Sequence, residues 1–381
     1  MFVEIHLIQN FAPANLNRDD TGSPKDCEFG GHRRARVSSQ CWKRSVREYF
    51  SQESLLPESQ LGVRTKRLAG TIASKLVEMD SSRSEEQAST VAALAVEALG
   101  TKLDAKFKED KRTSVLLFLG NDQVGSLTKL CDEHWQSLAE ASAKKKAEVS
   151  KEVAKQFRDA LKGSRAVDLA LFGRMIAEDA DKNVDAACQV AHAISTHRVA
   201  PEFDYYTAVD DLGRDDETGA GMIGTQEFNS ACFYRYANVS VPQLETNLQG
   251  DRELAISGLR TFLQSFIMAI PKAKQNGTAA QSLPCFAMVV VREKGLASLA
   301  NAFARPVDGR DGGLTLNSVN ALAKHYAKLI EMYGANGVKS AQFATMEDAD
   351  IQPLLGAGVS QARNVKELLD RALAVVTEKQ P

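Results

Sequence analysis

The stretch FGGHRRARVSSQCWKRSVR, from Phe29 to Arg47, changes from one kind of structure to another along its length. The part after the Gly30-Gly31 turn reads as a short extended segment, and the part from Ser38 or Ser39 onward reads as a helix that either serine can cap. Apolar residues recur at helical spacing on one face of that helix, namely Trp42, Val46, Tyr49 and Phe50. The pattern predicts an amphipathic helix that packs on a core and leaves its other face available.

The same stretch is strongly basic, with six Arg or Lys residues and no Asp or Glu, although the 381-residue chain has a formal net charge of -2. An isoelectric point of about 6.4 counts against a simple nucleic-acid binder, so any such function has to come from local charge or from an assembly. Glycines have no side chain, so a nucleic-acid backbone can come close to them. Clustered cations neutralise the phosphate charges of that backbone without recognising particular bases. A solvated basic face or internal ion pairs are the alternative. Arg33, Arg34 and Arg36 stay undecided, because alternate residues of an extended segment face opposite ways.

Working outward from this stretch, Met1 to Gln9 alternates apolar and polar residues and predicts a strand. Further strands are predicted at 166–172, 228–241 and 285–291, and further helices at 253–270, 316–333 and 363–377. The core order is strand, helix, strand, strand, helix, strand. This is the ferredoxin-like split βαβ arrangement of α+β proteins, which RNA-recognition domains also use.

Residues 64–162 are rich in helix formers, with apolar spacings of three and four. We therefore expect an inserted helical subdomain at 64–162 within an RNA-recognition-motif-like (RRM-like) domain made of 1–63 and 163–381. A polar, Gly-rich tip lies between two extended halves in 204–228, which predicts a protruding hairpin at about 200–227. Tyr205 and Tyr206 could stack on bases there or simply touch the core. The tip is acidic and could face a basic patch on a neighbouring molecule; its carboxylates are Asp210, Asp211, Asp215, Asp216 and Glu217.

The loop IPKAKQNGTAAQSLP (270–284) either donates backbone and side-chain hydrogen bonds to phosphates or is a plain connector. The polar residues and glycine that suggest phosphate contacts are Lys272, Lys274, Gln275, Asn276 and Gly277. Signals for catalysis are weak: there is no P-loop, G-x-S-x-G or H-E-x-x-H motif, and adjacent carboxylates such as Asp19 and Asp20 usually diverge. Six scattered cysteines without a C-x-x-C pair argue against a zinc ribbon and suit a reducing cytoplasm. We expect no catalytic site, metal or cofactor, no signal peptide or membrane span, and a cytoplasmic location.

Short motifs along nearly the whole chain resemble the backbone subunit (CasC-like) of the type I-E CRISPR surveillance complex, Cascade. The motifs are LNRDD (16–20), KD (25–26), FGGHRRARVSSQCWKRSVR (29–47), GRM (173–175), AHAISTHRV (191–199), YTAVDDL (206–212), GTQEF (224–228), FYRYANV (233–239), AKQ (273–275) and ANAF (300–303).

This resemblance implies a non-catalytic crRNA-binding scaffold in antiviral defence, with an RRM-like palm, helical fingers and a β-hairpin thumb. Copies would assemble as a helical filament along the guide RNA spacer, and each thumb would kink the RNA so that the remaining bases pair with target DNA. The implied partners are crRNA, target DNA through the guide heteroduplex, further copies of the chain and other Cascade subunits. The alternative is a CRISPR-associated endoribonuclease of the same fold class, which would cut with Asp19, Asp20 or Asp26.

The resemblance also implies roles for individual residues. The palm residues expected to hold crRNA phosphates are Arg18, Lys25, Ser38, Gln40, Lys43, Arg44 and Arg47. Lys274 and Gln275 would add contacts from the later loop, and Met175 and Tyr206 would wedge at the kinked nucleotide. The chain departs from the family pattern at Tyr206, where a phenylalanine is expected, and at His32, where a lysine is common.

Overall fold

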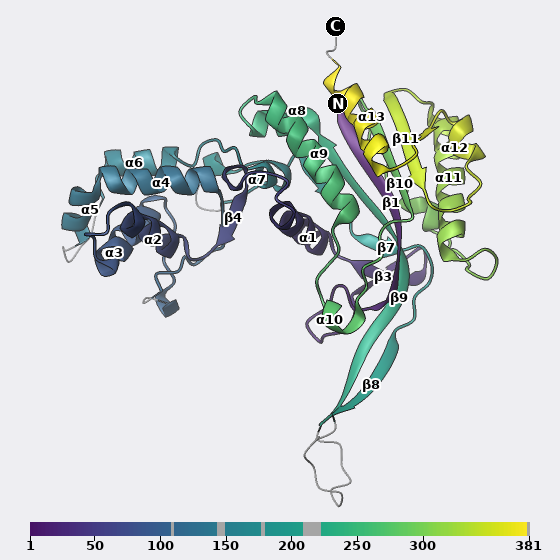
Figure 1. The fold of residues 1–381 in the computed structure, drawn as a ribbon, viewed down its shortest axis with the longest axis horizontal. Coiled ribbons are helices and arrows are strands. Elements are labelled where there is room, and N and C mark those ends of the chain that lie inside the picture. The colour runs from purple at the N-terminus through teal and green to yellow at the C-terminus, as the bar shows by residue number, and fades with distance from the viewer. Residues whose placement is uncertain (108–109, 143–148, 177–179, 209–221, 379–381) are drawn as a thin grey trace, which may run out of the picture. The chain divides into compact units, whose positions relative to one another are not determined.

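A computed structural model describes residues 1–107, 110–142, 149–176, 180–208 and 222–378 (Figure 1). The chain forms two compact units. The sheet unit comprises Met1–Phe50, Gln189–Val239 and Leu259–Pro381, and the helical unit comprises Ser51–Cys188 and Ser240–Gly258. The helical unit contains the segment predicted as an inserted subdomain, 64–162, whose role as fingers stays a prediction.

The sheet unit is built on one large sheet with the strand order β12-β11-β10-β1-β9-β7-β3-β2. These strands are β1 (Phe2–Ala14), β2 (Asp26–Phe29), β3 (His32–Val37), β7 (Ala193–Ser195), β9 (Met222–Ser240), β10 (Phe286–Arg292), β11 (Val338–Thr345) and β12 (Ser360–Gln361). In the middle of the sheet the order is β10-β1-β9-β7, which corresponds to strands 4-1-3-2 of a ferredoxin-like fold. The α+β fold class predicted from the sequence is therefore confirmed.

One predicted strand is wrong. Residues 166–172 form α7 (Val167–Phe172) of the helical unit, in which the amide of Ala170 donates to the carbonyl of Ala166 at 2.9 Å. Every residue of α7 is buried, and a short run that is apolar except for Asp168 is compatible with either a buried helix or a buried strand. The second strand of the ferredoxin-like core is instead β7, within the block AHAISTHRV.

Helices cover both faces of this sheet (Figure 1). Alternate residues of β1 and β9, such as Ile8 and Tyr234, pack with Val319 and Tyr326 of α11 (Leu314–Tyr333). Phe233 points to the other face and packs with Trp42 of α1 (Ser39–Gln52). The other helices of this unit are residues 259–268 of α9 (Arg252–Met268), α10 (Gln275–Thr278), α12 (Gln352–Gly356) and α13 (Val365–Thr377). Among the described residues, α11 and α1 therefore cover the two faces of the sheet at β1 and β9, where an RNA-recognition domain keeps one face open for stacking bases.

The hairpin predicted at 204–228 has both of its strands in the structure. β8 (Glu202–Ala208) pairs antiparallel with the first part of β9, with Glu202 opposite Phe228 and Tyr206 opposite Gly224. The hairpin extends away from the rest of the sheet (Figure 1). The acidic tip predicted at Asp210, Asp211, Asp215, Asp216 and Glu217 lies outside the described residues.

The helical unit packs its helices around an apolar core that includes Leu68, Val91 and Leu127. Its helices are α2 (Leu68–Met79), α3 (Glu85–Ala98), α4 (Asn121–Glu133), α5 (Trp135–Ser142), α6 (Lys151–Asp159), α7 and α8 (Val241–Asn247), together with residues 252–258 of α9. A two-stranded ribbon of β4 (Gly62–Thr65) and β5 (Leu117–Gly120) accompanies them, and β6 (Cys188–Val190) leads into the sheet unit. In the described part of the chain, no helix combines the length and the apolar character that a bilayer crossing requires.

Candidate nucleic-acid interface

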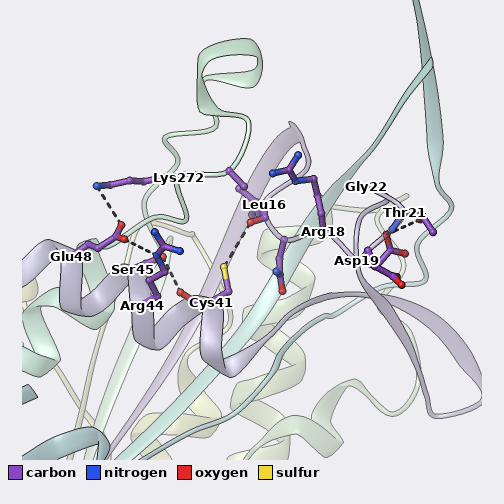
Figure 2. A pocket seen from close by; sticks show the side chains of 13 residues that line it. Leu16, Arg18, Asp19, Thr21, Gly22, Cys41, Arg44, Ser45, Glu48 and Lys272 are labelled. Atoms are coloured by element: carbon purple, nitrogen blue, oxygen red, sulfur yellow. Dashed lines mark hydrogen bonds and ion pairs between the residues drawn. The ribbon is translucent and has the colours of Figure 1, made fainter. Parts of the chain in front are cut away.

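An open hollow of about 780 Å³ lies on the surface of the sheet unit, where three segments meet (Figure 2). The first segment is the loop 16–22, the second is the exposed side of α1, and the third is the connector at 272–273. Arg18, Arg44 and Lys272 contribute one cation from each segment. The structure thus brings together basic residues that are far apart in the sequence.

The loop at 16–22 holds its own shape through Asp19. One carboxylate oxygen of Asp19 accepts hydrogen bonds from the amide of Thr21 at 2.9 Å, from the Thr21 hydroxyl at 2.8 Å and from the amide of Ser23 at 3.0 Å. The hydroxyl contact, followed by the amide contacts, lowers the pKa of Asp19. Arg18 lies exposed on this loop, so Asp19 shapes the loop while Arg18 faces solvent. Lys25 is half-buried just after the loop, with its amide donating to the carbonyl of Asn17 at 2.8 Å.

The start of α1 is fastened to the same loop. The amide of Ser38 donates to the side-chain oxygen of Asn17 at 2.8 Å, and the Ser38 hydroxyl accepts from the amide of Cys41 at 3.3 Å. Ser38 is buried, so its hydroxyl serves first as a cap of the helix, as its sequence position predicted. Its contact with a phosphate stays a prediction. Asn17 was missed from the sequence, although an Asn next to a turn is a common source of such side-chain to backbone bonds.

The exposed side of α1 carries the basic residues that its helical phase predicted. Gln40 and Arg44 are exposed, and Lys43 and Arg47 are half-buried. Glu48, which was not singled out from the sequence, pairs with Arg44 at 2.7 Å and with Lys272 at 3.3 Å. Partial burial opposes ionisation of Glu48, but hydrogen bonds from these two cations outweigh it and lower the pKa of the carboxyl. Glu48 therefore holds two cations at the hollow and offsets part of their charge.

Lys274 and Gln275, which were both predicted to contact RNA, have different surroundings in the connector after Pro271. Gln275 uses its amide to close the loop, because its nitrogen donates to the carbonyls of Pro271 at 2.8 Å and Ala280 at 3.3 Å and its oxygen accepts from Gln281 at 3.1 Å. Lys274 is exposed, with a left-handed backbone (φ 56°) at the start of α10. Of this pair, Lys274 is the better placed to reach a phosphate, and Gln275 shapes the loop.

The three arginines left undecided by the sequence have different surroundings. Arg34 is completely buried, and its acceptors among the described residues are carbonyl groups, which belong to Phe29, Ser195, Thr196, Phe303 and Ala304. Burial lowers its pKa, although the carbonyl dipoles satisfy its donors. Arg33 forms an ion pair with Asp26, and Arg36 donates to the carbonyl of Asp26 at 3.1 Å. Arg34 is thus a structural residue that ties β3 to neighbouring segments, and His32 is exposed at the adjacent turn.

A second buried arginine, Arg235, packs against the face of α1 that is turned toward the sheet. The guanidinium carbon of Arg235 lies 3.5 Å from the centroid of a Trp42 ring and 4.6 Å from that of Phe266. Arg235 also donates to the side chain of Gln9 at 2.5 Å, and full burial lowers its pKa strongly. The aromatic stack fixes α1 on the sheet, so the basic residues on its outer side start from a rigid base.

The hairpin of β8 and β9 carries aromatic side chains on both of its faces, because successive residues of a strand alternate. Phe203 and Tyr205 share one face and are 63% and 66% exposed. Tyr206 is on the other face and 41% exposed, with its ring against Gly224 of β9. Tyr206 therefore keeps one side of its ring available for a stacking partner.

The last predicted residue, Met175, belongs to the helical unit and is 84% exposed. It borders a cavity of about 390 Å³ whose lining includes Val115, Leu116 and Phe118, and the guanidinium of Arg64 lies 4.7 Å from the centroid of the Phe118 ring. Among the residues that the structure describes, no group of three or more His, Cys, Asp or Glu side chains is arranged to hold a metal ion.

Comparison with known proteins now identifies the family. A family model described as "CT1975-like protein" matches residues 3–371. The chain belongs to the CT1975-like protein family. The chain is also similar to a chain described as "CRISPR RNA-guided surveillance complex, pre-nicking", with a TM-score of 0.87 and 34% identity over 98% of this chain and 99% of that chain.

A second solved chain, described as "CRISPR RNA-guided surveillance complex", has a TM-score of 0.77 and 30% identity over 98% of this chain and 99% of its own length. No curated protein matches this chain significantly. Both similarities cover almost the full length, so this chain shares the fold of both solved chains. The resemblance to CRISPR surveillance-complex subunits drawn from the motifs is confirmed at this level.

Proposed function

We propose that this protein is a non-catalytic scaffold that binds the guide RNA backbone within a CRISPR RNA-guided surveillance complex of type I-E. The observation that carries the proposal is the hollow of the sheet unit, where loop, helix and connector each supply a cation, in a chain that is similar over its full length to surveillance-complex chains.

The distribution of charge favours backbone binding over base reading. The residues offered to RNA from the sheet unit are exposed or half-buried cations and an amide, namely Arg18, Lys25, Gln40, Lys43, Arg44, Arg47 and Lys274. Long cationic side chains on a surface neutralise phosphates and carry no sequence information. Because α11 covers the sheet face that RNA-recognition domains use for stacking, bases bound here stay free to pair with a target strand.

The proposal extends to assembly. Several copies line up along one guide RNA, and the aromatic hairpin and Met175 act as wedges that kink the RNA at intervals. Tyr206 supports this role through the open side of its ring, and Met175 supports it through its 84% exposure. Target DNA is then recognised by pairing with the guide, and the location of the complex is the cytoplasm.

The experiment that tests the proposal measures the affinity of the assembled protein for guide RNA as a function of salt. Replacing both Lys43 and Arg47 with Ala should lower the slope of log affinity against log salt by about 0.7 for each phosphate that the variant no longer neutralises. The loss of affinity should be the same for unrelated spacer sequences. The matched control replaces Lys324 and Lys328, on α11, which removes the same charge from another helix of the sheet unit. An equal change of slope in the control, or a strong dependence on spacer sequence, contradicts the proposal.

A separate assay tests whether the protein cuts RNA. Complementary RNA is bound to the complex in the presence of Mg²⁺. We expect no site-specific cleavage. Site-specific cuts that disappear in an Asp20→Ala or Asp26→Ala variant would instead assign an endoribonuclease.

A further inference from the structure

Met175 is highly exposed, but the backbone segment that carries it is held by several hydrogen bonds. α7 ends at Gly173, whose φ of 75° is left-handed, and a Cβ on Gly173 would come within 2.7 Å of the carbonyl oxygen of Val184. The next residue, Arg174, exchanges two backbone hydrogen bonds of 2.9 Å with Val184. The amide of Ile176 donates to the side chain of Asn183 at 2.6 Å. Hydrogen bonds at Arg174 and at Ile176 therefore hold the backbone on both sides of Met175.

The side chain of Arg174 points into the helical unit and is only 6% exposed. Its guanidinium donates to the carbonyl of Lys182 at 3.0 Å, to the side-chain oxygen of Gln123 at 3.0 Å and to the carbonyl of Leu161 at 3.0 Å. Burial lowers the pKa of Arg174 to about 10, which leaves the group cationic at neutral pH. One planar donor group thus joins three separate segments.

Successive side chains of an extended segment project to opposite sides. Anchoring Arg174 inward consequently directs Met175 outward, and the left-handed Gly173 and the bridge to Val184 prevent the segment from rotating. The side chain of Met175 is 84% exposed on this segment.

We propose that Arg174 is a positioning residue, whose buried guanidinium fixes the 173–176 segment so that Met175 is presented to the guide RNA as a rigid wedge. This inference rests on the proposed function, because the wedge needs an RNA to act on. Arg174 itself touches no RNA. The planar fork matters as well as the charge, since a lysine at this position has no geometry that reaches all three acceptors.

The test uses the full-length protein assembled on guide RNAs that carry 2-aminopurine at one spacer position at a time. This base fluoresces more strongly when it is unstacked, so positions kinked by a wedge give a high signal. Met175→Ala should shift the stacking equilibrium at those positions by about tenfold toward the stacked state, which is less fluorescent, so the signal there should decrease. Arg174→Lys should lower it to the same level while RNA affinity and the far-ultraviolet circular dichroism spectrum stay those of the wild type. The double variant should be no lower than Met175→Ala alone.

Arg165→Lys is the matched control, because Arg165 lies in the same unit but forms an exposed ion pair with Asp251 at 2.7 Å. Its signal should equal that of the wild type. Should Arg174→Lys fail to fold, Asn183→Ala loosens the same segment without disturbing a buried charge, and it should also lower the signal.

The outcomes separate the two proposals. A wild-type signal in folded Arg174→Lys or in Asn183→Ala, or a further decrease of the signal on adding Arg174→Lys to Met175→Ala, overturns the positioning role and leaves the wedge intact. If Arg174→Lys and Asn183→Ala both misfold, the 173–176 segment is needed for folding, and this outcome also overturns the positioning role of Arg174. A normal signal in Met175→Ala counts against the wedge in the proposed function, and the inference about Arg174 falls with it.

Discussion

The ring of Tyr206 on β8 lies directly over Gly224 on β9, and no room is left between them for a side chain. The two residues are opposite each other in the strand register, and a Cβ on Gly224 would come within 2.5 Å of the ring carbon that bears the hydroxyl. The glycine therefore provides the surface on which one side of the ring rests, which leaves the other side for a stacking partner.

Gly224→Ala should displace this ring without removing it. We expect the decrease in base unstacking to approach that of Tyr206→Ala, which removes stacking worth roughly 1–3 kcal/mol. The measurement is 2-aminopurine fluorescence in the assembled complex. Thr225→Ala is the control, because Thr225 is the next residue on β9 and faces the opposite side of the hairpin. If Gly224→Ala and Thr225→Ala give the same signal, Gly224 does not seat Tyr206.

Glu48→Gln should strengthen RNA binding. The carboxylate holds Arg44 at 2.7 Å and Lys272 at 3.3 Å, and the neutral amide holds both cations less firmly. If both become available to phosphates, the salt slope should steepen by up to about 1.4, or 0.7 for each additional phosphate neutralised on a single strand. Salt titration of guide RNA binding measures this. Glu367→Gln, in α13 near the C-terminus, removes one charge elsewhere and should leave the slope unchanged.

Arg34→Met should destabilise the fold far more than Arg33→Met. Methionine at 34 removes the hydrogen bonds of the guanidinium to five carbonyls, of which the Thr196 carbonyl keeps the amide of Val307 at 2.9 Å. Each buried carbonyl that is left without any donor costs about 1–3 kcal/mol. Arg33 has a side chain that is 60% exposed, so losing its ion pair with Asp26 should cost about 1 kcal/mol or less. Denaturant unfolding of the two variants compares the costs directly, and equal decreases in stability would contradict the structural role of Arg34.

The buried His6 should make the fold sensitive to acid. Burial, followed by the nearby Arg292 cation, lowers the pKa of His6 from 6.5 to about 3. The His6 ring nitrogen Nδ1 lies within hydrogen-bonding distance of the Tyr234 hydroxyl, at 2.9 Å, and that hydroxyl accepts from the amide of Leu299 at 2.8 Å. Between pH 6.5 and pH 3 the unfolded chain binds a proton at His6 and the folded chain does not. Acid therefore favours unfolding across that window.

Lowering the pH from 7 to 5 should reduce the free energy of unfolding by about 2 kcal/mol through His6 alone. His6→Gln keeps a hydrogen-bonding side chain but does not titrate. Between pH 7 and pH 5 the unfolding free energy of this variant should therefore decrease by about 2 kcal/mol less than that of the wild type. Denaturant melts at both pH values measure the difference, with the exposed His32→Gln as control. Identical pH dependence in wild type and His6→Gln would show that His6 is not buried in the neutral form.

Much of this protein follows from local pattern. Period-two alternation identified β1, and helical phase placed Trp42 and Val46 inward on α1 with Arg44 outward, because strand and helix geometry fix which side chains share a face. The run at 166–172 was the exception. Its residues are almost all apolar, so it carried no clear period, and the packing of the folded chain made it α7.

The α+β class, the amphipathic helix α1 and the basic stretch at 29–47 could be predicted from local sequence, since they depend on residues close together in the chain. Which cations lie near one another depends on the folded chain. Arg34 is buried and donates to carbonyls of segments more than 150 positions away, whereas Arg44 is exposed at the hollow. Glu48 forms ion pairs with both Arg44 and Lys272. Whether a charge faces RNA or the core depends on packing between segments distant in sequence, and no local pattern encodes that.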